Sequence, residues 1–249
     1  GNNTNSWLNP TEAKLTIASA MSIASEWNTI LVWSWTYWEY VNITKSNITL
    51  MGESPDTTFI TRTSAATTNV VDIAWHGVTV KWFTISHQAT NLLAVQITGN
   101  NATIFNNIVQ GIYWWIWSSN STGHSIINNT IAWVSSSSGW WAIWASGGSF
   151  LNISNNIIYG NNKWIYFSAD LPVGTKGNNL FFNNTSNYTN YTAGTWDIVA
   201  DPLFEIGTYR LQSTSPAIDS GSGSLASLWL ENRSTALNGT LDTGIIDRG

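Results

Sequence analysis

Short apolar runs alternate with polar residues along most of this chain, and polar turns separate one run from the next. Representative runs are VTVKWFTI from Val78, HSIINNTI from His124 and LNISNNII from Leu151. Aliphatic residues at every second position are typical of strands with one buried face. Outside one N-terminal segment, every strong signal is that of a strand or a turn, so the pattern predicts an all-β fold.

The N-terminal segment that differs is PTEAKLTIASAMSIASE, from Pro10 to Glu26. Its apolar residues lie near one face of a helix, and they are Leu15, Ile17, Ala18, Met21 and Ile23. Thr11 is a suitable N-cap residue and Glu12 suits a first turn. The segment therefore predicts one helix that caps the strand region.

The strand segments repeat along the chain. When six of them are aligned, one bend position holds Gly52, Trp82, Asn106, Asn128, Asn155 and Asn178, spaced 22 to 30 residues apart. A period in this range, with three short strands per unit and no helix between them, predicts a solenoid. Glycine and asparagine tolerate a positive φ, so we expect a left-handed bend at this position. Trp82 is the exception, because a bulky aromatic residue is unfavourable there.

The aligned repeats also place equivalent residues in columns. One aliphatic column holds Val80, Ile104, Ile126 and Ile153, and another holds Ile85, Val109, Ile131 and Ile158. One coil cannot bury such faces alone, so neighbouring coils must stack. A polar column follows the bend, and we predict that its amides form a structural ladder of Asn107, Asn129, Asn156 and Asn179.

The asparagine repeats and the opening SEWNTILVWSWTYWEYVNITKSNITLMGES resemble the right-handed parallel β-helix proteins of the pectin-lyase-like superfamily. ADPLFEIGTYRLQSTSPAIDSGS, from Ala200, is similar to the segment that closes many secreted members. The resemblance implies one β-helix domain over residues 1–249. We expect a cap and first coil at 1–45, repeat coils at 46–185 and a closing segment at 186–249. The motifs are more specific to the fold than to a function.

Tryptophan is unusually frequent, with 17 residues against 8 Tyr and 8 Phe. Trp27 and Trp35 stand where the first coil of the superfamily commonly has glycine. One hypothesis is that many or all tryptophans are glycine in the native protein, because some bacterial lineages read the codon UGA as glycine. The alternative is that the indoles are native and lie on the outer face. They would then be platforms for sugar rings, with candidate glycan-binding residues Tyr113, Trp115, Trp117, Trp141 and Trp144.

Charge and composition narrow the classes of partner. Only 9% of residues are charged and the formal net charge is -5, which argues against a nucleic-acid partner. The chain has no cysteine, and it has no apolar run long enough for membrane insertion. Frequent Asn-x-Ser/Thr sequons favour a secreted or cell-surface location. The sequence does not indicate an oligomeric state.

Acidic residues are missing from the middle coils. Residues 100–168 contain no Asp or Glu, and Lys163 is their one basic residue. Calcium-dependent lyase chemistry and hydrolysis by a carboxylate pair are therefore excluded on these coils, since both need carboxylates. A metal-free lyase remains an alternative, and its candidate catalytic residues are Lys81, His87 and Arg62.

Acidic residues gather instead near the C-terminus, at Asp197, Asp201, Glu205, Asp219, Asp242 and Asp247. Carboxylates in such a group can bind calcium. Asp-Pro and Asp-Ser-Gly are also ordinary turn sequences, in which the carboxylate accepts hydrogen bonds from nearby amides. We favour the turn interpretation, so we expect no metal site and no cofactor, with calcium as the alternative.

These observations lead to a functional expectation with two alternatives. The first interpretation is an extracellular β-helix module without catalytic activity, with a structural, adhesive or glycan-contacting role. The alternative is a polysaccharide lyase or glycoside hydrolase that acts on an extracellular polysaccharide. In either case, a polysaccharide or cell-surface glycan is the expected partner.

Overall fold

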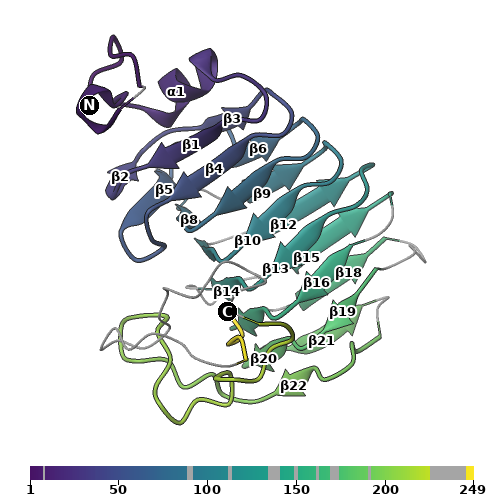
Figure 1. Ribbon diagram of the computed structural model, residues 1–249. Helices are drawn as coiled ribbons and strands as arrows, with labels where there is room; N and C mark the ends of the chain where they lie inside the picture. Colours follow the sequence, from purple (N-terminus) through teal and green to yellow (C-terminus); the bar gives the residue numbers. More distant parts are fainter. Residues whose placement is uncertain are drawn as a thin grey trace.

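The computed structural model confirms an all-β parallel solenoid with one short helix near its N-terminus (Figure 1). It describes residues 1–7, 9–88, 92–111, 114–133, 141–148, 151–160, 163–168, 174–189, 192–224 and 245–249. Three parallel sheets, which we call A, B and C, run along the solenoid, and up to β21 successive strands join them in turn. The helix lies at one end and the C-terminus lies near the other (Figure 1).

The strands are short in all three sheets. Sheet A contains β1 (Thr29–Val32), β4 (Thr49–Gly52), β7 (Thr79–Lys81), β10 (Thr103–Phe105), β13 (Ser125–Ile127), β16 (Asn152–Ser154) and β19 (Lys176–Gly177). Sheet B contains β2 (Trp35–Tyr37), β5 (Thr58–Arg62), β8 (Thr84–His87), β11 (Ile108–Gly111), β14 (Thr130–Trp133), β17 (Ile157–Tyr159), β20 (Leu180–Phe182) and β22 (Ile198–Val199). Sheet C contains β3 (Val41–Ile43), β6 (Val71–Ile73), β9 (Leu93–Ile97), β12 (Trp114–Ser119), β15 (Trp141–Ser146), β18 (Lys163–Phe167) and β21 (Ser186–Thr189).

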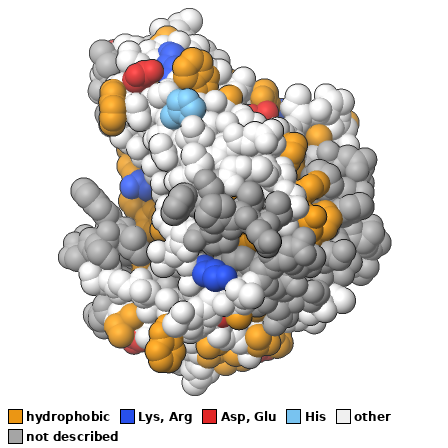
Figure 2. Space-filling model, turned by 90° about the vertical axis from the view of Figure 1, so that its right-hand side faces the viewer, with side chains coloured by type: hydrophobic (Ala, Val, Ile, Leu, Met, Phe, Trp, Pro, Cys, Tyr) orange, Lys and Arg blue, Asp and Glu red, His pale blue; other side chains and the backbone are white. Residues whose placement is uncertain are grey.

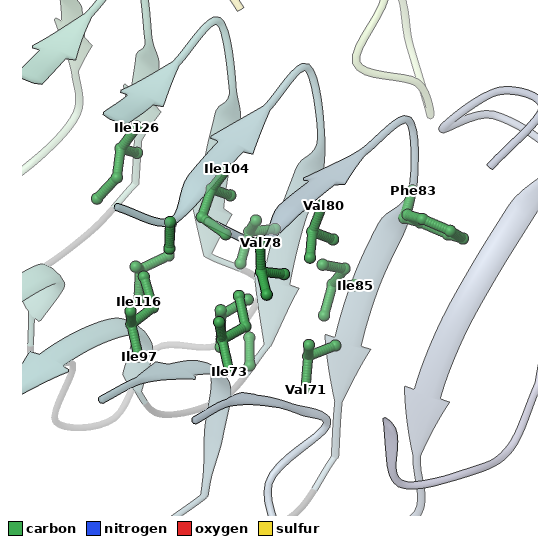
Figure 3. Packing of buried hydrophobic residues seen from close by; sticks show 14 of the residues in the cluster. Val71, Ile73, Val78, Val80, Phe83, Ile85, Ile97, Ile104, Ile116 and Ile126 are labelled. Carbon is green, nitrogen blue, oxygen red and sulfur yellow. The ribbon is translucent and has the colours of Figure 1, made fainter. Parts of the chain in front are cut away.

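The core is a set of aliphatic columns inside the three sheets. Val80, Ile104 and Ile126 occupy one register position of sheet A and are fully buried. Figure 3 shows them in a row, with Ile85 of sheet B and Val71 of sheet C pointing into the same interior. Because a single coil cannot bury its own apolar side chains, the coils stabilise one another through this shared core.

Asparagine side chains form a hydrogen-bonded ladder at the short bend between sheets A and B. The Oδ1 atom of Asn129 accepts from the backbone N–H and the side-chain amide of Asn107, at 3.0 and 3.2 Å. Asn129 bonds to Asn156 in the same way, and Asn156 to Asn179. Asp197 continues the ladder, because its carboxylate accepts from the backbone N–H of Asn179 at 2.8 Å. Each buried amide thereby satisfies backbone groups that water cannot reach.

The N-terminal helix is shorter than the sequence predicts. A 3-10 helix spans Pro10–Glu12, and α1 spans Ile17–Ile23. The helix cap is Thr16 and not Thr11, because the Thr16 hydroxyl accepts an N–H of the first turn. The Glu39 carboxylate accepts the first two helical N–H groups at 2.9 Å each. This contact comes from the first coil of the solenoid, so the local sequence gave no sign of it.

The bend column also differs from the prediction at one member. Asn106, Asn128, Asn155 and Asn178 have φ between 51° and 58°, as the alignment predicts. Gly52 is not among the glycines with positive φ. A Cβ atom at Gly52 would lie 2.3 Å from the carbonyl oxygen of Trp82, so close approach of the next coil explains this glycine.

The closing segment packs against the outside of the solenoid. Leu211 and Ala217 bury against Ile157 and Leu180, which point outward from sheet B. Arg210 forms an ion pair with Asp56 at 2.6 Å, which connects this segment to an early coil. At the chain end, the buried Arg248 donates hydrogen bonds to the carbonyls of Ser220, Asn179 and Trp196. The segment therefore covers part of the outer face of sheet B.

The buried His124 lies directly before β13. His124 Nδ1 accepts the backbone N–H of Ala102 at 3.2 Å, so the neutral ring carries its proton on Nε2. Nε2 lies 2.9 Å from the Ser121 hydroxyl, to which it donates. Burial lowers the pKa of His124 to about 4. Both ring nitrogens are thus engaged within the structure, which leaves no free acceptor for a catalytic base.

Removing one rung of the ladder tests its contribution to stability. Asn129→Ala deletes hydrogen bonds to the carbonyls of Ile104 and Ile127 and to Asn156, and it leaves buried groups unpaired. We expect the free energy of unfolding to fall by about 2–4 kcal/mol, measured by urea denaturation. The exposed Asn42→Ala is the matched control, with an expected change below about 0.5 kcal/mol. Equal changes for the two variants would contradict a structural role for the ladder.

The buried His124 predicts a pH dependence of stability. Its folded-state pKa of about 4 lies below the ordinary 6.5, so between these values the unfolded state binds a proton that the folded state does not. Stability therefore falls as the pH is lowered from 6.5 towards 4, by about 3 kcal/mol from this group. His124→Gln should lack this part of the slope in urea unfolding at several pH values, with the exposed His76→Gln as the control. Parallel slopes for both variants would refute the prediction.

Candidate functional site

Sheet C places a row of polar and aromatic side chains on its outer face. Strands β3, β6, β9, β12, β15 and β18 each carry a triplet in which the two flanking side chains point into the core and the central one points outward. Val41-Asn42-Ile43 shows this directly, because its burial alternates as buried, exposed, buried. The strand register aligns the central residues into one row, which we call the outer column: Asn42, Asp72, Gln96, Trp117, Trp144 and Tyr166.

The first half of the outer column is a hydrogen-bonded polar group. The Tyr40 hydroxyl donates to one carboxylate oxygen of Asp72 at 2.7 Å, and the Asn69 amide donates to the other at 2.8 Å. The same Asn69 amide nitrogen lies 2.6 Å from Gln96 Oε1. Burial, followed by the hydrogen bond to Asp72, raises the pKa of Tyr40 to about 12, so the phenol stays a donor at neutral pH. The orientations of Asp72 and Gln96 are therefore fixed by hydrogen bonds within the protein.

The second half of the outer column is aromatic. The ring centroids of Trp117 and Trp144 lie 5.9 Å apart, and those of Trp144 and Tyr166 lie 5.9 Å apart. Trp141 joins them, with its ring 5.0 Å from Trp144 and 4.9 Å from Tyr166. The Trp117 indole N–H donates to the Ser146 hydroxyl at 3.3 Å. Three strands thus contribute to one aromatic cluster of partly exposed rings.

The structure brings three of the five candidate glycan-binding residues together. Trp117, Trp141 and Trp144 belong to the aromatic cluster. Tyr113 lies outside the described residues, as does the side chain of Trp115. The fourth ring of the cluster is that of Tyr166, which was not among the candidates.

The three candidate catalytic residues lie on two different sheets. Arg62 and His87 are register neighbours in sheet B, and His87 is only 2% exposed. Arg62 donates to the Thr68 hydroxyl at 2.9 Å. Lys81 is on sheet A, with its ammonium 4.5 Å from the ring centroid of Trp82. This placement gives no shared site on the outer column.

Carboxylates of the closing segment accept backbone N–H groups, at a local turn in the case of Asp201 and across the segment in the case of Asp247. Asp201 accepts the N–H of Leu203 at 2.9 Å, and Asp247 accepts that of Asp219 at 2.7 Å. Asp197 belongs to the asparagine ladder described above. Within the described ranges, no three His, Asp or Glu side chains form a group that could hold a metal ion. Asp242 lies outside these ranges, and calcium binding stays an alternative prediction.

Sequence reasoning missed the polar half of the outer column, although a signal was present. The triplets Val41-Asn42-Ile43, Val71-Asp72-Ile73 and Val95-Gln96-Ile97 share two aliphatic residues around one polar residue. The alignment followed the strands of sheets A and B, because their asparagine bend is easy to recognise. The loops that precede sheet C vary in length, which concealed the register of its strands.

Two further features are the distribution of apolar side chains on the surface and the length of the helices. One face carries patches of apolar side chains within a largely uncharged surface (Figure 2). In the part of the chain that the structure describes, no helix is long and apolar enough to span a membrane.

Comparison with known proteins finds structural neighbours but no matching family. No family model and no curated protein matches this chain. Similar solved structures include a pectin methylesterase bound to a hexasaccharide, with 16% identity, a TM-score of 0.45, and coverage of 68% of this chain and 74% of that chain. The pectin methylesterase from Yersinia enterocolitica has 14% identity, a TM-score of 0.44, and coverage of 75% and 81%. The enzyme from Erwinia chrysanthemi has 15% identity, a TM-score of 0.43, and coverage of 71% and 76%. The assignment of the fold rests on the topology of the chain itself: three parallel sheets and one N-terminal helix make it a capped right-handed parallel β-helix.

Proposed function

We propose that the outer column of sheet C binds a polysaccharide at the cell surface or outside the cell. The observation that carries this proposal is the continuous row from Asp72 to Tyr166, with hydrogen-bonding groups at one end and rings at the other. The row runs along the solenoid, across the strands. A glycan chain laid along it would meet one side chain on each coil.

The polar half supplies the hydrogen bonds that orient a sugar. Asp72 is an acceptor for sugar hydroxyls, and Gln96 offers a side-chain amide beside it. Tyr40 and Asn69 hold both groups in place, so little side-chain entropy is lost on binding. The carboxylate of Asp72 and the net charge of -5 both disfavour a polyanion. The expected ligand is therefore a neutral or esterified polysaccharide.

The aromatic half supplies apolar contact. Sugar rings present faces of C–H groups, and indole and phenol rings stack on them while the hydroxyls bond at the rim. Trp117, Trp144 and Tyr166 come from neighbouring coils, so their rings follow the same direction as the polar half. The combination favours glycan contact over a purely structural or adhesive role for this face.

A second candidate function is an enzyme that acts on such a polysaccharide. Asp72 favours it, because a carboxylate held by two donors on an accessible face can act as a base or a nucleophile. Hydrolysis by two carboxylates requires a second acid about 5–9.5 Å away. In the outer column as described, Asp72 is the one carboxylate, so binding is the better supported function.

Glycan binding can be measured by affinity electrophoresis and calorimetry. The probes are neutral polysaccharides, methyl-esterified pectin and polygalacturonate; pectin is included because the fold neighbours are pectin methylesterases. We expect Gln96→Ala and Trp144→Ala each to weaken binding to a neutral or esterified probe by about tenfold, or 1.4 kcal/mol. Trp35→Ala, which removes an exposed indole from sheet B, should leave the affinity unchanged. Binding that all three variants retain would exclude the outer column as the site.

Catalysis is tested with the same probes by following new reducing ends, unsaturated ends and released methanol. If the face is catalytic, Asp72→Asn should lower kcat at least a hundredfold, because the amide cannot act as a base. The exposed Glu26→Gln is the charge-matched control. If the wild-type protein binds a probe without converting it, the binding function is supported and the enzymatic function is refuted.

A further inference from the structure

Four tryptophans adopt a backbone conformation that favours glycine. Their φ angles are 69° at Trp7, 68° at Trp27, 66° at Trp82 and 62° at Trp196. A left-handed conformation costs an L-residue about 1–2 kcal/mol, because Cβ approaches the following carbonyl oxygen. Asparagine, which tolerates it, holds eight of the other positive-φ positions among the described non-glycine residues; Leu203 and Asp219 hold the remaining two. A bulky aromatic residue at four such positions is an outlier.

Trp82 shows most clearly what the position requires. It lies directly after β7, at the bend where later coils have Asn106, Asn128 and Asn155. Its N–H donates to the carbonyl of Asn106 at 3.2 Å, whereas the N–H of Asn106 donates to the carbonyl of Ile127, the residue before Asn128, at 3.2 Å. The coils nevertheless share a left-handed residue at this bend, with φ of 66° at Trp82 and 51° to 58° at Asn106, Asn128 and Asn155.

Packing does not compensate for the strain at two of the other positions. The side chains of Trp27 and Trp196 are 77% and 75% exposed. Little apolar surface is therefore buried to offset an unfavourable backbone conformation. Trp7 differs, because it packs against the edge of the core. Exposure and positive φ together make Trp27 and Trp196 the strongest members of the set.

We propose that glycine is the native residue at Trp7, Trp27, Trp82 and Trp196. The codon UGA specifies glycine in one genetic code and tryptophan in another. A gene from an organism that uses the first code, translated with the second, acquires tryptophan at each UGA glycine. Such replacement puts tryptophan where the backbone needs glycine, which is the pattern of these four turns. The inference is independent of glycan binding, because none of the four belongs to the outer column.

The tryptophans of the aromatic cluster belong to a different structural class. Trp117, Trp141 and Trp144 lie in strands of sheet C and are absent from the positive-φ residues. Trp117 and Trp144 have Gln96 and Tyr166 as register neighbours, and both of these are ordinary strand residues. Their backbone therefore gives no reason for glycine. If their codons are also UGA, Tyr166 and the polar half remain as the binding face.

The direct test is peptide mass spectrometry of the protein purified from its source organism. The peptides that cover Trp27, Trp82 and Trp196 should carry the mass of glycine at these positions, and the gene should have UGA there. Tryptophan masses with UGG codons would overturn the proposal. Peptides that cover Trp117 and Trp144 are read in the same experiment, so the outcome for the turns is separate from that for the binding face.

Recombinant variants provide a second measurement. Trp27→Gly, Trp82→Gly and Trp196→Gly should each raise Tm by about 2–4 °C, because they relieve a left-handed residue. Trp35→Gly is the control: this indole is 71% exposed, but it lies in a strand, where glycine lowers stability. A lower Tm for Trp27→Gly and Trp196→Gly would also overturn the proposal.

Discussion

The parallel stacking of strands, which sets each residue directly beside its equivalent on the next coil, is the constraint on which this structure depends. Stacked coils bury aliphatic columns without leaving polar groups unpaired. They also bring together the polar groups of the interior, which need hydrogen-bond partners. The amides of Asn107, Asn129, Asn156 and Asn179 answer this requirement, because each accepts from one coil and donates to backbone carbonyls. Asp197 completes the ladder where the next asparagine would stand. The solenoid is therefore held by a polar column as well as by its apolar core.

The same constraint creates the candidate binding face. Side chains alternate across each strand, so a residue between two buried aliphatics must point outward. Repetition over the coils of sheet C turns single outward residues into a continuous row from Asp72 to Tyr166. The closing segment packs on sheet B, where Leu211 meets Leu180 and Ile157. A ligand that extends along the solenoid suits such a row better than a compact ligand does, and this relates the fold to a polysaccharide.

Stacking also fixes the backbone at the bends, whatever residue occupies them. Asn106 and Trp82 share one conformation because their strands are paired, although only asparagine tolerates it well. A repeated fold therefore reveals a misplaced residue more clearly than an irregular fold would, since the neighbouring coils show what the position requires. At the position of Trp82, four later coils have asparagine with positive φ. At the position of Trp117, other coils have Gln96 and Tyr166 in ordinary strand conformation. The two groups of tryptophan are thus distinguished by their backbone and not by their chemistry.

The sequence by itself determined the parallel β-helix, the aliphatic columns and the positions of the ladder asparagines, because each depends on a period that repetition makes visible. It also located Trp117, Trp141 and Trp144, though as separate clusters along the chain. Only the tertiary structure decided that Trp117 and Trp144 share a row with Asp72 and Gln96, since loops of unequal length hide the register of sheet C. It also decided where the N-terminal helix begins, because the distant carboxylate of Glu39 accepts the N–H groups of Ile17 and Ala18. Local patterns report which face of a strand is buried, whereas contacts between coils decide which outward side chains meet.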